Sequence, residues 1–214
     1  MRRAVIFANG KLPYPAAIRA LLRPDDWIVA ADGGTRHALT CGRCPHLIIG
    51  DLDSFPPGRR ANLEAHGVEF LPYPADKDET DLELALLHVA SNNVTGVLIV
   101  GALGGRLDQT LANIQLLARP ELRSLDVQIT DGRQSARLVQ SKATIHGAAG
   151  SRLSLLPLGG DARGICTSGL KWPLANETLH FGQTRGVSNV MTGPVAHIQL
   201  ETGLLLCIHM TDER

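Results

Sequence analysis

The chain has 214 residues, of which 44% are hydrophobic and 20% are charged, and its 21 Lys and Arg balance its 21 Asp and Glu. A chain of this length and composition can bury a core without disulfides or metals, and two domains are the better expectation. A formal net charge of zero offers no basic field to a polyanion, so we expect no nucleic-acid partner.

The start of the chain and its cysteines indicate the cellular compartment. The segment MRRAVIFANG holds too short an apolar run for a signal peptide, and no stretch approaches the roughly 18 apolar residues of a membrane span. We therefore expect a cytoplasmic protein with no membrane partner and four reduced cysteines. Cys41 and Cys44 lack a second pair at zinc spacing, so we interpret them as packing or surface residues, with a local metal or redox use left open.

Short apolar runs alternate with segments of helical period over the first 130 or so residues. The apolar runs predict strands within 4–9, 27–34, 46–51, 68–74, 96–105 and 125–132. Helical periodicity predicts helices near 14–22, 35–41, 57–66, 80–91 and 108–118. This alternation predicts an α/β domain over residues 1–132, with a parallel sheet covered on both faces. In such sheets, ligands bind at the carboxyl ends of the strands.

Helical periodicity disappears beyond about residue 140. Short apolar stretches separated by Gly, Pro, Asn and Asp predict strands within 152–159, 164–170, 177–181, 195–201 and 204–210. This pattern is typical of an all-β sandwich or barrel, and we predict a β-sandwich domain over residues 140–214. The polar and basic segment 131–143 is the expected domain boundary.

Two aspartates, Asp51 and Asp53, directly follow the predicted strand HLIIG. In an extended segment residues i and i+2 point to the same side, and a turn can bring them closer, so both carboxylates can face one cation. Carboxylates and nucleotide phosphates are the ligands that Mg²⁺ favours. The alternative is that the two aspartates only cap turns.

A second acidic group surrounds the start of the predicted helix in PADKDETDLELALL. Asp76, Asp78 and Asp81 lie there with Lys77, and Thr80 or Asp78 can cap the helix. These acids could simply favour the helix dipole, or they could join a metal and phosphate site.

Glycine-rich turns follow two further strands. In VGALGGRLDQTLANI the turn is followed by Arg106 and by Asp108 at a helix start, and such a turn can cradle a phosphate that the arginine pairs with. In AADGGTRHAL, Gly33 and Gly34 would let the backbone approach a ligand closely. Each segment could equally be an ordinary turn.

The combination of these turns is more informative than any one of them. The carboxylates of Asp51, Asp53, Asp81 and Asp108 would gather on one edge of the sheet, where a divalent cation would relieve their mutual repulsion. This arrangement suggests metal-assisted transfer of a phosphoryl-type group from a nucleotide.

The ordered motifs ADGG, PHLIIGDLDSF, DKDETDLELAL and GALGGRLDQTLANI resemble those of the thiamine pyrophosphokinase family. The segment SGLKWPLANETLHFGQTRGVSNVMTG extends the resemblance through the second domain, so the likeness spans nearly the whole chain. It implies an α/β nucleotide domain followed by a β-sandwich, and a homodimer. The implied activity uses ATP and Mg²⁺ to move a diphosphate group onto the hydroxyl of thiamine, with release of AMP.

The resemblance also implies residue roles. It assigns Mg²⁺ and pyrophosphate to Asp51, Asp53, Asp81 and Asp108. It assigns nucleotide and phosphate contacts to Gly33, Gly34, Lys77, Thr80, Arg106 and Gln109. The group that removes the hydroxyl proton is left open between Asp81, Asp108 and a metal that lowers the need for a base.

In the second domain the resemblance makes Trp172 a stacking platform for a cationic heteroaromatic ring, with Ser188 and Asn189 as hydrogen-bonding partners of the pyrimidine. Trp172 could instead be a core residue. If Trp172, Ser188 and Asn189 were absent, an acceptor such as a hydroxymethylpterin would be favoured. If one of the four aspartates were lost, a non-catalytic nucleotide or thiamine sensor would be favoured. The chain has both sets. A sugar-nucleotide transferase would leave the other turns unexplained.

Overall fold

The computed structural model describes residues 2–52 and 57–211. Its contacts divide the chain into two compact units, Met1–Gly132 and Arg133–Arg214. Residues 133–139, which the sequence left between the two predicted domains, therefore belong to the second unit. Within the described residues, no helix combines the length and the apolar character needed to cross a bilayer.

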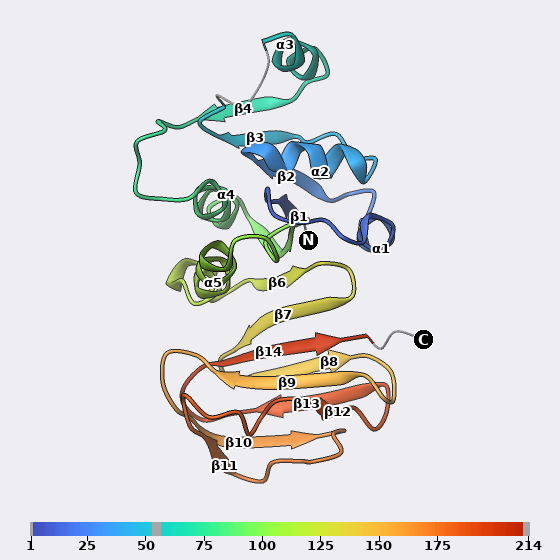
Figure 1. Cartoon of the computed structure of the whole chain (residues 1–214), viewed down its shortest axis with the longest axis vertical. Helices are drawn as coiled ribbons and strands as arrows, with labels where there is room; N and C mark the ends of the chain where they lie inside the picture. Colours follow the sequence, from blue (N-terminus) through green and yellow to red (C-terminus); the bar gives the residue numbers. More distant parts are fainter. Residues whose placement is uncertain (1, 53–56, 212–214) are drawn as a thin grey trace. The chain divides into compact units, whose positions relative to one another are not determined.

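The first unit is built on a parallel sheet with strand order β6-β5-β1-β2-β3-β4 (Figure 1). Its strands are β1 (Arg2–Phe7), β2 (Trp27–Ala31), β3 (Leu47–Gly50), β4 (Glu69–Pro72), β5 (Val94–Val100) and β6 (Asp126–Thr130). From β1 the chain adds strands outward through β4 and then crosses to β5 on the other side of β1. This reversal between β1 and β5 is the topological switch point at which open α/β sheets bind ligands.

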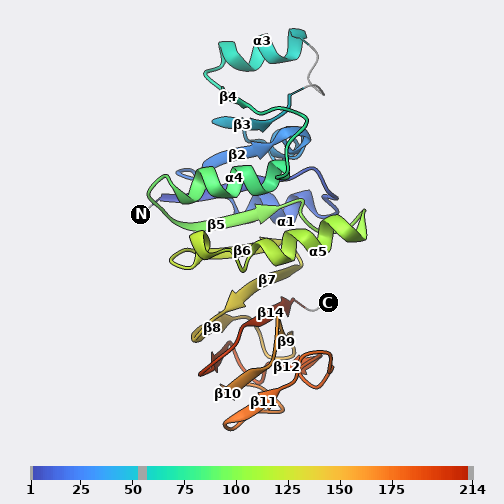
Figure 2. The ribbon, with the colours of Figure 1, turned by 90° about the vertical axis from the view of Figure 1, so that its left-hand side faces the viewer.

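Each helix predicted for this unit is present. The helices are α1 (Pro15–Leu21), α2 (Thr35–Thr40), α3 (Pro57–Ala65), α4 (Asp81–Ala90) and α5 (Leu107–Leu116), with short 3-10 turns η1 (Asp32–Gly34) and η2 (Pro120–Leu122). Figures 1 and 2 both show α4 beside α5, and the two helices are in contact. Thr80, one of the two caps that the sequence offered, caps α4 by accepting a hydrogen bond from Glu83 N.

Both faces of the parallel sheet are covered, as the apolar strands predicted. Val5 and Phe7 of β1 form one buried cluster with Ile18 of α1 and Ala38 of α2. Successive strand residues point to opposite faces, so the fully buried Ile6 faces the other side, where α4 contacts β1, β2 and β3. Because helices cover both faces, a ligand reaches this sheet at the ends of its strands.

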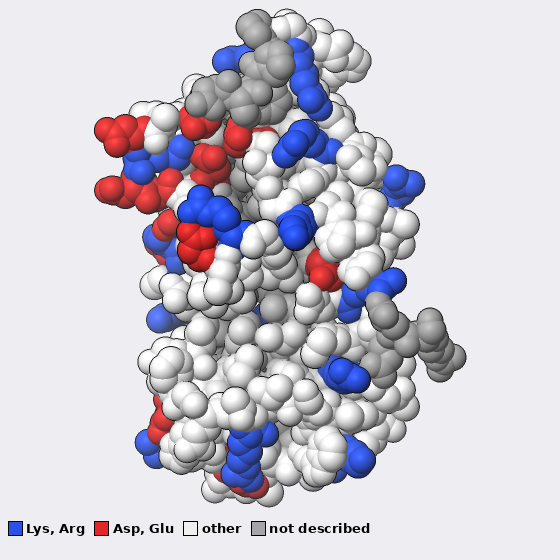
Figure 3. All heavy atoms as spheres, viewed as in Figure 1, with Lys and Arg blue, Asp and Glu red and all other residues white. Residues whose placement is uncertain are grey.

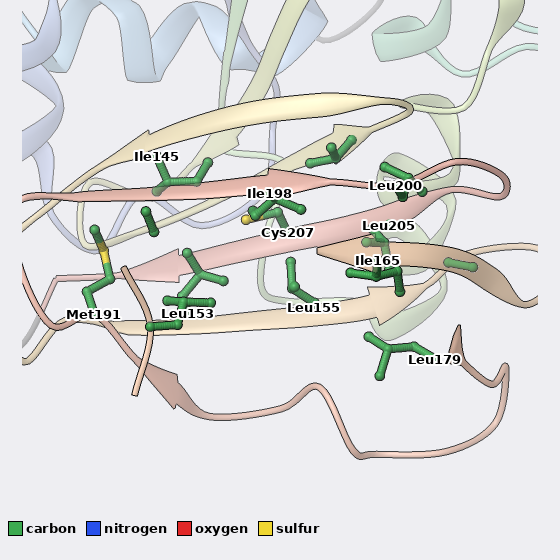
Figure 4. Packing of buried hydrophobic residues seen from close by; sticks show 14 residues of the cluster. Ile145, Leu153, Leu155, Ile165, Leu179, Met191, Ile198, Leu200, Leu205 and Cys207 are labelled. Atoms are coloured by element: carbon green, nitrogen blue, oxygen red, sulfur yellow. The ribbon is translucent and has the colours of Figure 1, made fainter. Parts of the chain in front are cut away.

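The second unit is a sandwich of two antiparallel sheets, with strand orders β12-β9-β14-β7 and β11-β10-β13-β8. Its strands are β7 (Gln134–Val139), β8 (Lys142–His146), β9 (Arg152–Pro157), β10 (Ala162–Ser168), β11 (Glu177–Leu179), β12 (Asn189–Val190), β13 (Val195–Gln199) and β14 (Leu205–Met210). Buried apolar side chains from both sheets form its core (Figure 4). The sequence did not predict β7, β8 or β12.

The cysteines lie in different surroundings and all four are free thiols. Cys41 is buried in the first unit and Cys44 is exposed. Burial raises the pKa of the Cys41 thiol, and it raises the pKa of the Cys207 thiol in the second unit to about 12. Both buried thiols are therefore protonated at neutral pH and act as small apolar groups in their cores.

Candidate functional site

A cleft of about 560 Å³ lies in the first unit, at the carboxyl ends of its strands. Segments that follow β1, β2 and β5 line it, together with the segment that leads into α4 and one side of α5. The cleft therefore occupies the switch point between β1 and β5, where the topology predicts a ligand site.

The backbones that follow β1 and β5 are joined at the floor of this cleft. Gly10 N donates to Gly101 O at 2.7 Å, and Ala8 N donates to Val100 O at 2.8 Å. Gly101 has φ +73°, and a Cβ added there would lie 2.4 Å from Ala8 O, so only glycine fits. Asn113 of α5 is buried and donates from Nδ2 to Ala102 O at 2.9 Å, which ties the helix to the same turn.

Acidic residues converge where β2, β3 and the start of α4 meet. A Cβ added at Gly50 would lie 2.9 Å from Asp32 Cβ and 3.3 Å from Asp81 Cγ. Asp32 and Asp81 therefore stand against Gly50, the residue that precedes Asp51. Asp51 itself is half-buried. Asp32 and Asp81 also line the cleft. Figure 3 shows Asp and Glu side chains gathered beside the segment that enters α4.

Leu52 explains how the chain turns between the two aspartates that follow β3. The strand ends at Gly50, and Leu52 has φ +61°, so the backbone is not extended through this residue. Leucine adopts this left-handed conformation at a cost of about 1 kcal/mol, which burial offsets. Leu52 packs with Ile48 and Leu63 in a buried cluster. Asp53 lies outside the described residues.

Lys77 and Asp81 form the central ion pair of the cleft. Lys77 Nζ lies 2.9 Å from Asp81 Oδ1, and both side chains are largely buried. Asp81 Oδ1 is buried and accepts no hydrogen bond from the described residues, so the contact with Lys77 is an ion pair. Thr80, next to it in sequence, also lines the cleft. The sequence placed these three residues together.

Arg106 and Asp108 pair with each other at the mouth of the cleft. Arg106 donates from Nε to Asp108 Oδ1 at 3.1 Å and from Nη2 to Asp108 Oδ2. These hydrogen bonds, with one from Gln109 N, hold the pKa of the Asp108 carboxyl below its ordinary value. Arg106 and Gln109 line the cleft, whereas Asp108 is exposed and is not among its described lining residues.

Gly33 and Gly34 also lie outside the described lining of the cleft. Gly34 is buried, and a Cβ there would lie 1.8 Å from Phe7 O, so this glycine lets η1 approach β1. A Cβ at Gly33 would lie 2.5 Å from the side chain of Asn9, which does line the cleft. The two glycines therefore act indirectly: Gly33 makes room for the cleft residue Asn9, and Gly34 makes room for the end of β1.

The residues predicted to contact the second substrate lie together in the second unit. Asn189 donates from Nδ2 to Trp172 O at 2.7 Å and accepts from Trp172 N at 3.2 Å, which clamps the Trp172 backbone. Trp172 is 55% exposed, and Lys171 Nζ lies 4.7 Å from the centroid of its ring. Ser188, with φ +61°, donates from its backbone to Ser154 Oγ. Trp172 is therefore a surface residue and not part of the core.

Sequence reasoning missed several residues of the cleft, among them Asn9, Lys11 and Asp32. Asp32 stands in the ADGG motif, where its position at a strand end was available as a signal. Asn9 and Lys11 follow β1 without a recognised motif. Among the described residues, no three His, Cys, Asp or Glu side chains meet closely enough to hold a metal ion.

Comparisons with known proteins agree on one family. A family model described as thiamin pyrophosphokinase, catalytic domain, matches residues 18–129, and one described as thiamin pyrophosphokinase, vitamin B1 binding domain, matches residues 142–205. Thiamine pyrophosphokinase of Bacillus subtilis (strain 168) is 30% identical over 188 residues, covering 87% of each chain.

Solved structures give the same result. The crystal structure of thiamine pyrophosphokinase from Bacillus subtilis matches with a TM-score of 0.86 at 25% identity, covering 100% of both chains. That of thiamin pyrophosphokinase from Geobacillus thermodenitrificans matches with a TM-score of 0.84 at 25% identity, covering 100% of this chain and 99% of the other. The α/β unit followed by a β-sandwich is thus the fold of these proteins.

Proposed function

Because this chain belongs to the thiamine pyrophosphokinase family, we propose that it transfers the diphosphate group of ATP to the hydroxyl of thiamine, giving thiamine diphosphate and AMP. The observation that carries this proposal is the cleft at the switch point of the sheet, where the Lys77 and Asp81 pair stands beside Asp32 and Arg106. Alternating acids and cations suit a polyphosphate that arrives with a divalent cation. Neither family model favours a pterin acceptor.

The described residues offer Mg²⁺ one or two carboxylates and not a complete cage, which suits an ion that arrives on nucleotide phosphates. Asp81 Oδ1 is buried without a hydrogen bond from the described residues, and its one close neighbour of opposite charge is the Lys77 ammonium. A buried carboxylate oxygen is a hard ligand of the kind that Mg²⁺ prefers, and it becomes available when the Lys77 ammonium turns to the phosphates. We propose that Asp81 and Asp51 hold Mg²⁺ with Asp32 beside them, and we add Asp53 and Asp108 on sequence alone. When bound, the ion would neutralise phosphate charge.

The chemistry assigned to the chain's own residues is positioning and charge stabilisation. The thiamine hydroxyl oxygen forms a bond to the β-phosphorus of ATP, the bond from that phosphorus to the α-phosphate bridging oxygen breaks, and AMP leaves. Lys77 and Arg106 would compensate the phosphate charges, with Thr80 and Gln109 as hydrogen-bonding groups. The lowered pKa of Asp108 makes its carboxylate a weaker base than an ordinary aspartate.

The second unit would bind thiamine through Trp172. The contact with the Lys171 ammonium shows that the ring can hold a cation, and the cationic ring of thiamine would stack on it in the same way. Asn189 uses one amide N–H to clamp Trp172, which leaves the other for the pyrimidine. We also propose a homodimer in the cytoplasm, as the family resemblance implies, and analytical ultracentrifugation tests the dimer directly.

Product analysis tests the proposed function. The purified chain is mixed with MgCl₂, ATP and thiamine, and the products are separated by chromatography, with a control that lacks thiamine. We expect AMP and thiamine diphosphate to appear together, and only when thiamine is present. Formation of ADP would instead indicate single phosphoryl transfer, and the absence of any product would refute the proposal.

A further inference from the structure

The segment that follows β1 carries a cation, Lys11, to which neither the sequence motifs nor the family comparisons assign a role. We propose that Lys11 binds a phosphate of the donor nucleotide, as a third cation of the cleft in addition to Lys77 and Arg106. This inference rests on the proposed function and adds a residue to the same site.

The charge balance of the cleft carries the first part of the argument. Lys77 pairs with Asp81, and Arg106 pairs with Asp108. Lys11 lines the cleft but forms no ion pair with any residue that the structure describes. A cleft cation without a protein counter-charge is available to an anionic ligand. Lys77 and Arg106, in contrast, would have to divide their charge between a protein carboxylate and the ligand.

The backbone that carries Lys11 is fixed in place. Gly10 N donates to Gly101 O, and Lys11 N donates to Leu103 O at 3.3 Å, so this segment is joined to the turn after β5. His37 Nε2 lies 2.8 Å from Gly10 O. Because a carbonyl can only accept, this nitrogen carries the proton and donates. The position of Lys11 is therefore set by contacts that do not involve its own side chain.

The stem of Lys11 lies over the glycine-rich turn. A Cβ added at Gly104 would lie 3.3 Å from Lys11 Cδ and 3.4 Å from Lys11 Cβ. The glycine thus leaves room for the aliphatic chain to run along the turn, which is how lysine keeps its charged end in solvent or on a ligand. The aliphatic stem of Lys11 therefore lies against a turn of the kind that accommodates phosphate.

Direct binding tests this inference without depending on turnover. Isothermal titration calorimetry measures the affinity for ATP in the presence of MgCl₂, and for adenosine, which has no phosphate. We expect Lys11→Met to weaken ATP binding about tenfold or more and to leave adenosine binding unchanged. Lys11→Arg, which keeps the charge, should restore most of the affinity. Lys142→Met, the same change at an exposed position of the second unit, should bind ATP as the wild type does.

Each outcome decides the matter. Equal ATP affinity of Lys11→Met and wild type would overturn the inference and leave the proposed function standing. Equal losses for ATP and adenosine would also overturn it, since they would indicate a general effect on the cleft and not a phosphate contact. A wild-type protein that binds no ATP would refute both the inference and the proposed function. The wild-type titration distinguishes this outcome from the first, in which the wild type binds ATP.

Discussion

In the first unit, the side chains of the cleft stand on backbone that is held by contacts between strand ends, whereas in the second unit Trp172 is 55% exposed on a loop. Gly10 and Gly101 join the segments after β1 and β5 through a 2.7 Å hydrogen bond. The Trp172 backbone is held by two hydrogen bonds with one side chain, that of Asn189, which donates one and accepts the other.

This difference suits the two ligands that we propose. Transfer of a diphosphate group requires charges at fixed positions, because positioning and charge stabilisation account for most of the catalysis. Recognition of an organic ring requires only an exposed aromatic face and a few hydrogen bonds. Substitutions in the first unit should therefore affect turnover or folding, and substitutions around Trp172 should affect the saturation of one substrate.

The largest effect is expected at Asp81. We expect Asp81→Asn to lower kcat at least about 100-fold while the protein stays folded, because the amide keeps the shape of the side chain but loses the charge. Steady-state kinetics with saturating ATP and thiamine measures the loss. Asp51→Asn and Asp53→Asn are expected to remove most turnover as well.

Asp78→Asn is the matched control for Asp81→Asn. It is the same change three residues away, at an exposed aspartate that is not among the described lining residues of the cleft. We expect near-wild-type kcat for this variant. Near-normal kcat in Asp81→Asn would contradict the site, and an equal loss in both variants would point to the general negative potential of the segment and not to Asp81 itself.

A large effect on folding is expected at Gly34. A Cβ there would lie 1.8 Å from Phe7 O, which is backbone and cannot move aside as a side chain can. The helical φ of −58° adds no conformational penalty, so the clash alone should destabilise Gly34→Ala by about 3 kcal/mol or more. Urea denaturation measures the free energy of unfolding.

Gly58→Ala provides the opposite control in the same unit. Gly58 lies in α3, and a Cβ there meets no atom within 4 Å. Alanine should stabilise this helix by about 0.5–1 kcal/mol through its higher helix propensity. If Gly34→Ala were as stable as wild type, the close approach of η1 to β1 would not be needed to build the cleft.

The sequence predicted the α/β unit well because its strands are short, apolar and separated by helical periods. It predicted the sandwich less completely. β7, with the sequence QSARLV, mixes polar and basic residues with apolar ones and does not alternate cleanly, since it is only partly buried. Pairing with β14 makes it a strand, and this is a contact between distant segments that local pattern does not reveal.

The site was predicted in part for a related reason. Acids at strand ends are visible in sequence, and Asp81 lies where the motif placed it. The left-handed backbone of Leu52 is not visible, because leucine rarely adopts it and only burial in the core imposes it. Lys11 belongs to no motif, and its place in the cleft follows from the β1 and β5 pairing.

The smallest loss of function is expected at Trp172, and it distinguishes the roles proposed for the two units most clearly. Trp172→Ala should raise the KM for thiamine about tenfold, with little change in the KM for ATP, because stacking contributes only about 1–2 kcal/mol and acts on one substrate. The free energy of unfolding should change little, since the ring is largely exposed. Phe181→Ala removes another exposed aromatic ring of the same unit and should leave both KM values unchanged. Unchanged thiamine saturation in Trp172→Ala would rule out the stacking role. A rise in both KM values would show that Trp172 also affects ATP binding. The proposal that each unit binds one substrate would then be wrong.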